Sequence, residues 1–160
     1  MTNILLLGDA GTGKSSWLRR LMSRGFTESY ATTIGKDTDV LTFDGRKIIV
    51  HDIGGHERFV DATKLYYPIA HGALIFYDTT RTNPRTSYWV RKVPDVPYIL
   101  VGNKNDLGHA HTHGHSISCK NDEGVVEVLR DLLERVPEVP DEETTILDYI
   151  WHLLSRLWTG

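Results

Sequence analysis

The stretch Gly8–Ser15, GDAGTGKS, follows a short apolar run, Ile4–Leu7, and precedes a segment predicted to be helical, Ser16–Arg24. It has the spacing G-x-x-x-x-G-K-[S/T] of a phosphate-binding loop between a strand and a helix. Glycines let the backbone curl so that successive N–H groups point inward, and the start of the helix adds positive potential. The Lys14 ammonium can bridge phosphate oxygens, and the Ser15 hydroxyl can hold Mg²⁺. The stretch therefore predicts a site for nucleotide phosphates.

Length and composition indicate one ordinary domain. The chain has 160 residues, of which 40% are hydrophobic and 24% charged, with a formal net charge of −3. A chain of this length can bury a proper core, and the composition is that of a globular protein. The net charge offers no electrostatic footprint for nucleic acid or for an anionic membrane. We therefore expect no nucleic-acid partner.

The single cysteine and the two ends of the chain indicate the cellular compartment that we expect for the protein. Cys119 alone cannot form an intramolecular disulfide framework, which suits a reducing environment. The early apolar run Ile4–Leu7 leaves no room for a signal peptide, and no apolar run approaches the roughly 20 residues of a membrane span. The last residues, Leu157–Gly160, contain no cysteine for prenylation. We expect a soluble cytoplasmic or nucleoplasmic protein without a stable lipid anchor.

Further short apolar segments predict the rest of a sheet. The residues Thr38–Phe43 alternate, Asp44-Gly45 is typical of a hairpin turn, and Arg46–His51 returns as an apolar strand. Two near-continuous apolar strands follow, Ala73–Tyr77 and Tyr98–Val101. Such strands are buried on both faces and belong to a mostly parallel sheet.

Helical segments separate these strands, and polar motifs follow them. A broken helical signal covers Pro84–Val93, and an amphipathic helix is predicted from about Asp122 to Val136. The alternation predicts a three-layer α/β fold. The motifs that begin at Gly8, Asp52 and Asn103 all follow strands, and ligands bind beyond the carboxyl ends of parallel strands. We expect these motifs to converge on one edge of the sheet.

Two loops carry further candidate residues. The polar stretch Gly25–Gly35 lacks a clean period, as loops that carry function near a phosphate site often do. In Asp52–Phe59 an acidic residue leaves a buried strand and is followed by two glycines. This pattern suggests a carboxylate near Mg²⁺ and a backbone N–H that is free to approach a phosphate.

The order of elements and five motifs resemble the Ras superfamily of small GTPases over residues 2 to about 136. The motifs are GDAGTGKS, Thr33 within TTIG, Asp52–Gly55 as D-x-x-G, NKND at 103–106 and SCK at 118–120. The segments GHERF, YYPIAHG, YDTT and VGNKNDL look like the Rab branch, and GDAGTGK is also close to Ran. The resemblance implies a Ras-like P-loop domain over 1–136 that binds GTP or GDP with Mg²⁺ and hydrolyses GTP.

The resemblance also implies roles for individual residues. The residues that would bind the nucleotide are Gly11, Thr12, Gly13, Lys14, Ser15, Ser16, Phe26, Tyr30, Thr33, Gly55, Asn103, Lys104, Asp106, Ser118, Cys119 and Lys120. The residues that would hold Mg²⁺ are Ser15, Thr33 and, through water, Asp52. The residues that would act in hydrolysis are His56, Lys14, Gly55 and Thr33.

Partner binding would follow the bound nucleotide. The segments 27–38 and 54–68 would be two switches, ordered by the γ-phosphate and released after hydrolysis. Effector proteins would recognise these switches, and an exchange factor and a GTPase-activating protein would complete the cycle.

Guanine selectivity has a clear chemical basis in this resemblance. The Asp106 carboxylate can accept from both guanine N1–H and the exocyclic amine, a donor pattern that adenine lacks. A carboxylate left unpaired in the site makes that rejection strong. Asn103 and Lys104 would brace the loop with the Lys104 stem over the base, Phe26 would lie against the ring, and the Cys119 N–H would meet guanine O6.

The first departure from the family pattern is His56, where the family usually has a glutamine that orients the attacking water. A histidine there resembles the translation elongation factors. An imidazole can bind water, but its reach and charge differ from those of an amide. Ala10 adds a methyl group near the γ-phosphate. We favour slow hydrolysis that a partner could rescue. Ordinary hydrolysis rates and near-inactivity remain alternatives. The near-inactive form would be a constitutive GTP-dependent interaction module.

The second departure is the short connection between Asp106 and Ser118, which leaves no room for the helix that the family carries there. It contains a histidine-rich loop, His109–His115, whose alternate histidines could bind Zn²⁺ or Ni²⁺ if the loop is extended. A polar loop that replaces the lost helix is the simpler interpretation and the one we favour.

The C-terminal part adds an acidic linker with prolines, 137–143, and an amphipathic helix candidate, 144–158, within 144–160. This helix could cover the flank of the sheet that the missing helix exposes, bind a partner or a second copy, or lie on a membrane. An alternative alignment would make 144–158 the family's final helix and SCK accidental. We favour SCK as a motif because a strand precedes it and Gly124-Val125 opens the next helix.

Overall fold

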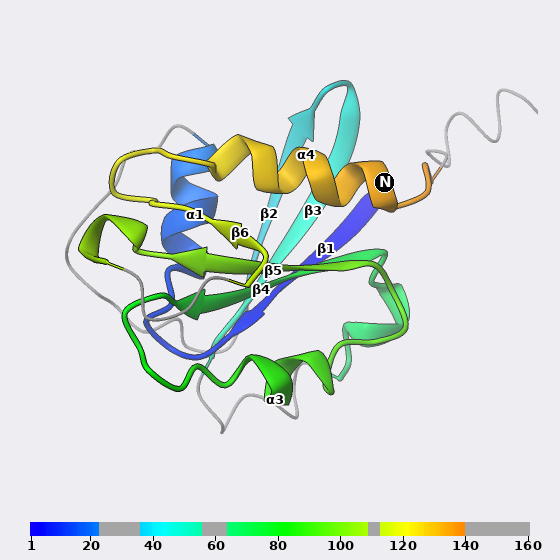
Figure 1. The fold of residues 1–160 in the computed structure, drawn as a ribbon. Coiled ribbons are helices and arrows are strands. Elements are labelled where there is room, and N and C mark those ends of the chain that lie inside the picture. The colour runs from blue at the N-terminus through cyan, green and yellow to red at the C-terminus, as the bar shows by residue number, and fades with distance from the viewer. Residues whose placement is uncertain (23–35, 56–63, 109–112, 140–160) are drawn as a thin grey trace, which may run out of the picture.

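The computed structural model describes residues 1–22, 36–55, 64–108 and 113–139. Six strands form one sheet in the order β2-β3-β1-β4-β5-β6 (Figure 1). The strands are β1 (Thr2–Gly8), β2 (Lys36–Phe43), β3 (Arg46–Ile53), β4 (Gly72–Asp78), β5 (Tyr98–Asn103) and β6 (His115–Ser116). All neighbours are parallel except β2 and β3. The predicted mostly parallel α/β fold is confirmed.

Helices cover both faces of this sheet. The α-helices are α1 (Lys14–Leu21), α3 (Thr86–Val90) and α4 (Val125–Arg135), and the 3-10 turns are η2 (Tyr67–Ile69) and η3 (Asn105–Leu107). Helices α1 and α4 lie on one face and α3 on the other (Figure 1). Because successive strand residues point to opposite faces, Ile4 and Leu6 pack with α1 and α4, whereas Leu5 and Leu7 pack with Trp89 of α3.

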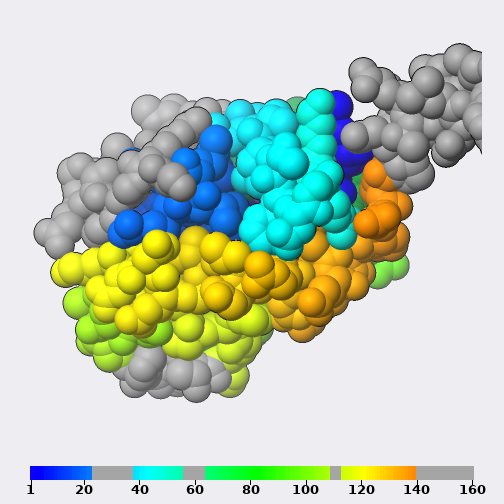
Figure 2. Space-filling view, turned by 90° about the horizontal axis from the view of Figure 1, so that it is seen from above, coloured from blue at the N-terminus to red at the C-terminus, as the bar shows by residue number. Residues whose placement is uncertain are grey.

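The β2–β3 hairpin turns at Asp44 and Gly45, as the sequence predicts. Both residues have positive φ, 47° and 79°, which the two-residue turn of type I′ requires. The hairpin also contacts α4, because the Arg46 guanidinium donates to the carbonyls of Leu133 at 2.8 Å and Val136 at 3.3 Å. Figure 2 shows the surfaces of the hairpin, α1 and α4 lying against one another.

The helix bounds differ from the prediction by a few residues. Helix α1 begins at Lys14, two residues earlier than predicted, directly after the left-handed Gly13, and ends at Leu21. Helix α3 covers only Thr86–Val90 of the predicted segment Pro84–Val93. Helix α4 begins at Val125, as the Gly124-Val125 pair predicts, and does not extend back to Asp122 because the preceding residues form a tight turn. In that turn Ser118 pairs with Glu123, Asp122 has a φ of 63° and Gly124 a φ of 71°. A helix cannot continue back through two left-handed residues.

The connection from β5 to β6 is short, as expected. Its described residues contain the single turn η3 and no α-helix, and residues 109–112 lie outside the described part. The predicted C-terminal helix, 144–158, and most of the predicted linker also lie outside it. Within the described ranges, no helix is long and apolar enough to cross a membrane.

The contact between α1 and α4 generates a prediction about stability. Trp17 is fully buried, and its indole N–H donates to the Val125 carbonyl at 2.9 Å. We expect Trp17→Phe to lower the free energy of unfolding by about 2–4 kcal/mol, because it leaves a void and removes the hydrogen bond to α4. Urea denaturation measures this change. The exposed Val126→Ala on the same helix is the control and should change the free energy by less than about 0.5 kcal/mol.

Candidate nucleotide-binding site

The loop after β1 has a backbone that only glycine allows at two positions. Gly8 and Gly13 have φ of 134° and 97°. A Cβ on Gly8 would lie 2.2 Å from the Phe76 carbonyl oxygen, and one on Gly13 would lie 2.0 Å from Nδ2 of Asn103. Gly11, with a φ of 79°, completes the curled loop. Successive backbone groups in such a loop form a concave cradle for an anion.

Lys14 lies at the base of this cradle and is 5% exposed. Its ammonium donates to the carbonyls of Gly8 at 2.7 Å and Asp9 at 3.0 Å. Burial lowers the pKa of Lys14 to about 8, although the negative charges of Asp52 and Asp9 act to raise it. A buried cation that is solvated mainly by carbonyls is chemically suited to an anionic ligand.

Asn103 at the end of β5 joins this loop to the SCK segment. Its Nδ2 donates to the Thr12 carbonyl at 3.0 Å, and its Oδ1 accepts from the Cys119 N–H at 3.1 Å. The Cys119 N–H, which the family resemblance assigns to guanine O6, is therefore directed at Asn103 in this structure. The Cys119 side chain is buried, and burial raises the pKa of its thiol to about 12.

The SCK segment is held by its own contacts. Ser118 Oγ donates to Asp106 Oδ1 at 2.7 Å and leaves the Asp106 side chain exposed. The Arg20 guanidinium of α1 donates to the carbonyls of Cys119 at 3.0 Å and Lys120 at 2.9 Å. The structure thus brings NKND and SCK together, which the alternative alignment does not account for.

Lys104 has a partner that the sequence analysis missed. Its backbone is left-handed, with a φ of 71°, and its ammonium contacts Asp78 Oδ2 at 2.6 Å. Asp78 ends β4 and also accepts from the N–H and hydroxyl of Thr80. Burial alone would raise the pKa of Asp78, but the hydrogen bonds from Lys104 and Thr80 outweigh it and hold that pKa below its usual value.

The predicted Mg²⁺ ligands Ser15 and Asp52 lie side by side. The Ser15 hydroxyl donates to Asp52 Oδ2, and Asp52 is 2% exposed at the end of β3. A hydroxyl and a carboxylate are hard oxygen ligands of the kind that Mg²⁺ prefers, so these residues fit the ion. Gly55 lies against the phosphate loop, where a Cβ would be 2.4 Å from the Gly8 carbonyl oxygen.

The structure describes only some of the other candidate site residues. Ser16 lies in the first turn of α1. Phe26, Tyr30, Thr33 and His56 lie outside the described residues. In the described ranges no group of three histidine, cysteine or acidic residues is arranged to hold a metal ion. His115 instead contacts Asp131 of α4 at 2.7 Å, and part of the histidine-rich loop is not described.

The strand, the glycine-rich loop, the buried lysine and the convergence of motifs at one sheet edge define a P-loop nucleotide-binding domain. A family model described as the Ras of Complex, Roc, domain of DAPkinase matches residues 3–106. The chain therefore belongs to the Ras superfamily of small GTPases, and the relatives below place it close to the Rab proteins.

Three relatives show the extent of this similarity. Ras-related protein Rab-1C of Dictyostelium discoideum is 42% identical over 131 residues, which are 75% of this chain and 65% of the relative. GTP-binding protein ypt1 of Schizosaccharomyces pombe is 40% identical over 115 residues, 65% of this chain and 57% of the relative. A Ras and EF-hand domain-containing protein of Danio rerio is 32% identical over 165 residues, 96% of this chain and 25% of the relative. The chain thus spans less than two thirds of the length of each.

The two bonds of Asn103 generate a prediction. We expect Asn103→Ala to lower the free energy of unfolding by about 2–3 kcal/mol, because it leaves the Thr12 carbonyl and the Cys119 N–H buried without partners. The neighbouring Asn105 is the control, since its buried Oδ1 has no hydrogen-bond partner in the described part of the chain. Asn105→Ala should change the free energy by less than about 0.5 kcal/mol. Equal effects in urea denaturation would contradict the role assigned to Asn103.

Proposed function

We propose that this protein binds GTP and GDP with Mg²⁺, hydrolyses GTP slowly, and acts as a molecular switch for effector proteins. The observation that carries the proposal is the Asn103 amide, which joins the phosphate loop to the SCK segment. This contact brings the glycine-rich loop and the SCK segment together at one edge of the sheet, where the proposal places the phosphates and the base. Membership in the Ras superfamily supports the same conclusion.

The phosphates would lie in the cradle of Gly11, Thr12 and Gly13, with Lys14 beneath them and Ser15 and Ser16 at the start of α1. The buried Lys14 ammonium supports this role, because burial lowers its pKa to about 8 and the negative charges of Asp52 and Asp9 offset that burial only in part. Ser15, Asp52 and Thr33 would hold Mg²⁺. When bound, Mg²⁺ neutralises charge on the phosphate oxygens.

The guanine base would be bound by residues of the NKND and SCK motifs. Asp106 would accept from guanine N1–H and the exocyclic amine. The Ser118 hydroxyl donates to Asp106 Oδ1, and this contact supports the role because it holds the carboxylate in place. The ion pair with Asp78 would hold the Lys104 stem over the base. Cys119 and Lys120 would complete this side, with Phe26 and, from the first switch, Tyr30.

Hydrolysis would proceed by in-line attack of water on the γ-phosphorus, which breaks the bond to the bridging oxygen and leaves GDP and phosphate. His56 would orient the water, and the N–H groups of Gly55 and Thr33 would sense the γ-phosphate. The close approach of Gly55 to the phosphate loop supports its part in this arrangement. The alternative is a module that holds GTP with little turnover and acts as a constitutive interaction protein.

The switch segments 27–38 and 54–68 would be the surface that effectors recognise. An exchange factor would replace bound GDP by GTP, and a GTPase-activating protein would accelerate hydrolysis. The names of two relatives support a nucleotide-dependent role, since one is a Ras-related Rab protein and the other a GTP-binding protein.

Single-turnover hydrolysis tests the role of His56. We expect slow phosphate release by the wild type and release roughly tenfold faster for His56→Gln, because an amide is neutral and reaches the attacking water as in the family pattern. His71→Gln is the control, since that histidine contacts the N–H of Asn3 away from the site. A faster wild type would make His56 a working catalytic residue. Bound GTP with no release from either protein would favour the interaction module.

Base selectivity tests the role of Asp106. Asp106→Asn keeps one acceptor and gains a donor, so it matches xanthine, which has a carbonyl where guanine has the amine. We expect GDP binding to weaken by roughly 10²-fold or more and xanthosine diphosphate binding to strengthen, as measured by competition with a fluorescent nucleotide. Asp122→Asn, at an exposed residue near Arg20, should leave both affinities unchanged. Unchanged selectivity in Asp106→Asn would exclude this residue as the base reader.

A further inference from the structure

The phosphate loop contains a carboxylate, Asp9, to which the sequence analysis assigns no role. A negative side chain in a loop that receives phosphates is electrostatically unfavourable unless it is turned aside or neutralised. The direction of this side chain is therefore informative.

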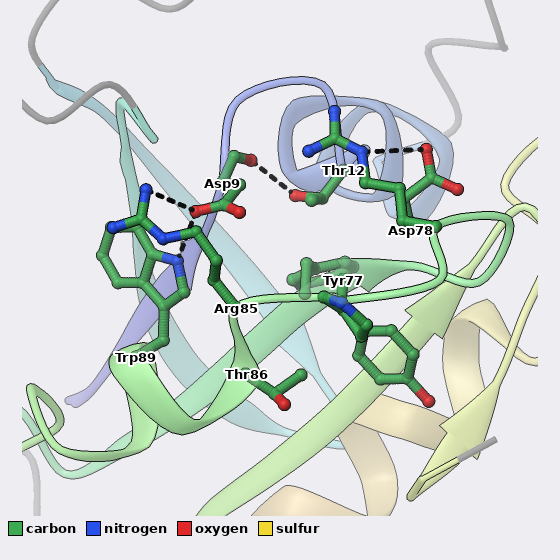
Figure 3. Close-up of a pocket in the computed structure, with 10 residues that line it drawn as sticks. Asp9, Thr12, Tyr77, Asp78, Arg85, Thr86 and Trp89 are labelled. Carbon is green, nitrogen blue, oxygen red and sulfur yellow. Dashed lines mark hydrogen bonds and ion pairs between the residues drawn. The ribbon is translucent and has the colours of Figure 1, made fainter. Parts of the chain in front are cut away.

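The Asp9 carboxylate is directed at α3 and away from the interior of the loop. Its Oδ1 accepts from the indole N–H of Trp89 at 2.8 Å, and Nη1 of Arg85 lies 4.0 Å from the same oxygen. Figure 3 shows both side chains meeting the carboxylate at the wall of a pocket that Thr12 and Asp78 also line. The Arg85 guanidinium also lies 4.4 Å from the centre of the Tyr88 ring, which holds it in this position.

The backbone of Asp9 closes the loop at the same point. Its carbonyl accepts from the Thr12 hydroxyl at 2.8 Å and from the Lys14 ammonium at 3.0 Å. Anchoring the Asp9 side chain therefore also fixes the Asp9 carbonyl, which accepts these two hydrogen bonds.

Trp89 provides a rigid anchor for this contact. It is 3% exposed and packs in the apolar cluster with Leu5, Leu7 and Ile53, beneath the ends of β1 and β3. Its ring position is thus set by the core, and the polar edge of the indole is left to meet Asp9. Through this bond the loop is held in place against the sheet.

We propose that Trp89 and Asp9 are positioning residues, whose hydrogen bond holds the phosphate loop in the conformation that receives the nucleotide and turns its carboxylate away from the phosphates. This inference rests on the proposed function. A loop that is ready only part of the time binds more weakly by that fraction, and a loop that opens easily releases its ligand sooner. The bond should therefore lengthen the residence time of the nucleotide.

The test compares binding and release of a fluorescent GDP in the presence of Mg²⁺ for the full chain and four variants. Trp89→Phe keeps a smaller aromatic ring and removes the N–H, and we expect about five- to tenfold weaker binding, mostly through faster release. Asp9→Asn keeps an acceptor for the indole and removes the charge, so it should bind at least as tightly as the wild type. Tyr88→Phe keeps the neighbouring ring and should match the wild type.

Asp9→Ala covers the case in which Trp89→Phe disturbs the core. It removes the acceptor without changing a core residue, and we expect faster release than from Asp9→Asn. If Trp89 only stabilised the fold, Asp9→Ala and Asp9→Asn would release GDP at the same rate. Thermal unfolding of each variant measures the change in stability separately.

Each outcome decides the inference. Release from Trp89→Phe at the wild-type rate, or equal release from Asp9→Ala and Asp9→Asn, would overturn it while leaving the proposed function in place. Faster release from both variants that break the bond, Trp89→Phe and Asp9→Ala, would support it. A wild type that fails to bind guanine nucleotide at all would overturn the proposed function, and the inference with it.

Discussion

The side-chain amide of Asn103 is the contact on which the whole site depends. It donates to the Thr12 carbonyl, 91 residues away in the sequence, and accepts from the Cys119 N–H. The space that it occupies exists only because residue 13 is a glycine, whose missing Cβ would lie 2.0 Å from Nδ2. One buried amide therefore fixes the distance between the phosphate loop and the SCK segment. That distance determines which ligand can span the two.

Both faces of the sheet contribute to holding this arrangement. From one face, α1 fixes the SCK side, because Arg20 donates to the carbonyls of Cys119 and Lys120 and Trp17 donates to Val125. From the other face, α3 fixes the phosphate side through the bond from Trp89 to Asp9. A loop with several left-handed residues is costly to order, so contacts from two directions are needed to keep it in one conformation.

The sequence predicts the parts of this molecule that depend on local patterns. Alternating and continuous apolar runs locate the strands, Asp44-Gly45 locates the hairpin turn, and the glycine spacing locates the phosphate loop. Local patterns do not reveal pairs that only the fold brings together, such as Lys104 with Asp78 and Trp89 with Asp9. Because the left-handed Asp122 carries no strong local signal, the amphipathic pattern extends α4 back to about Asp122, whereas the helix begins at Val125.

Burial of Lys14 links the site to the stability of the fold. Burial lowers its pKa to about 8, and the negative charges of Asp52 and Asp9 offset that burial only in part. An anion in the loop removes this imbalance, and a ligand that binds only the folded state stabilises it. Nucleotide binding should therefore add to the stability of the folded chain.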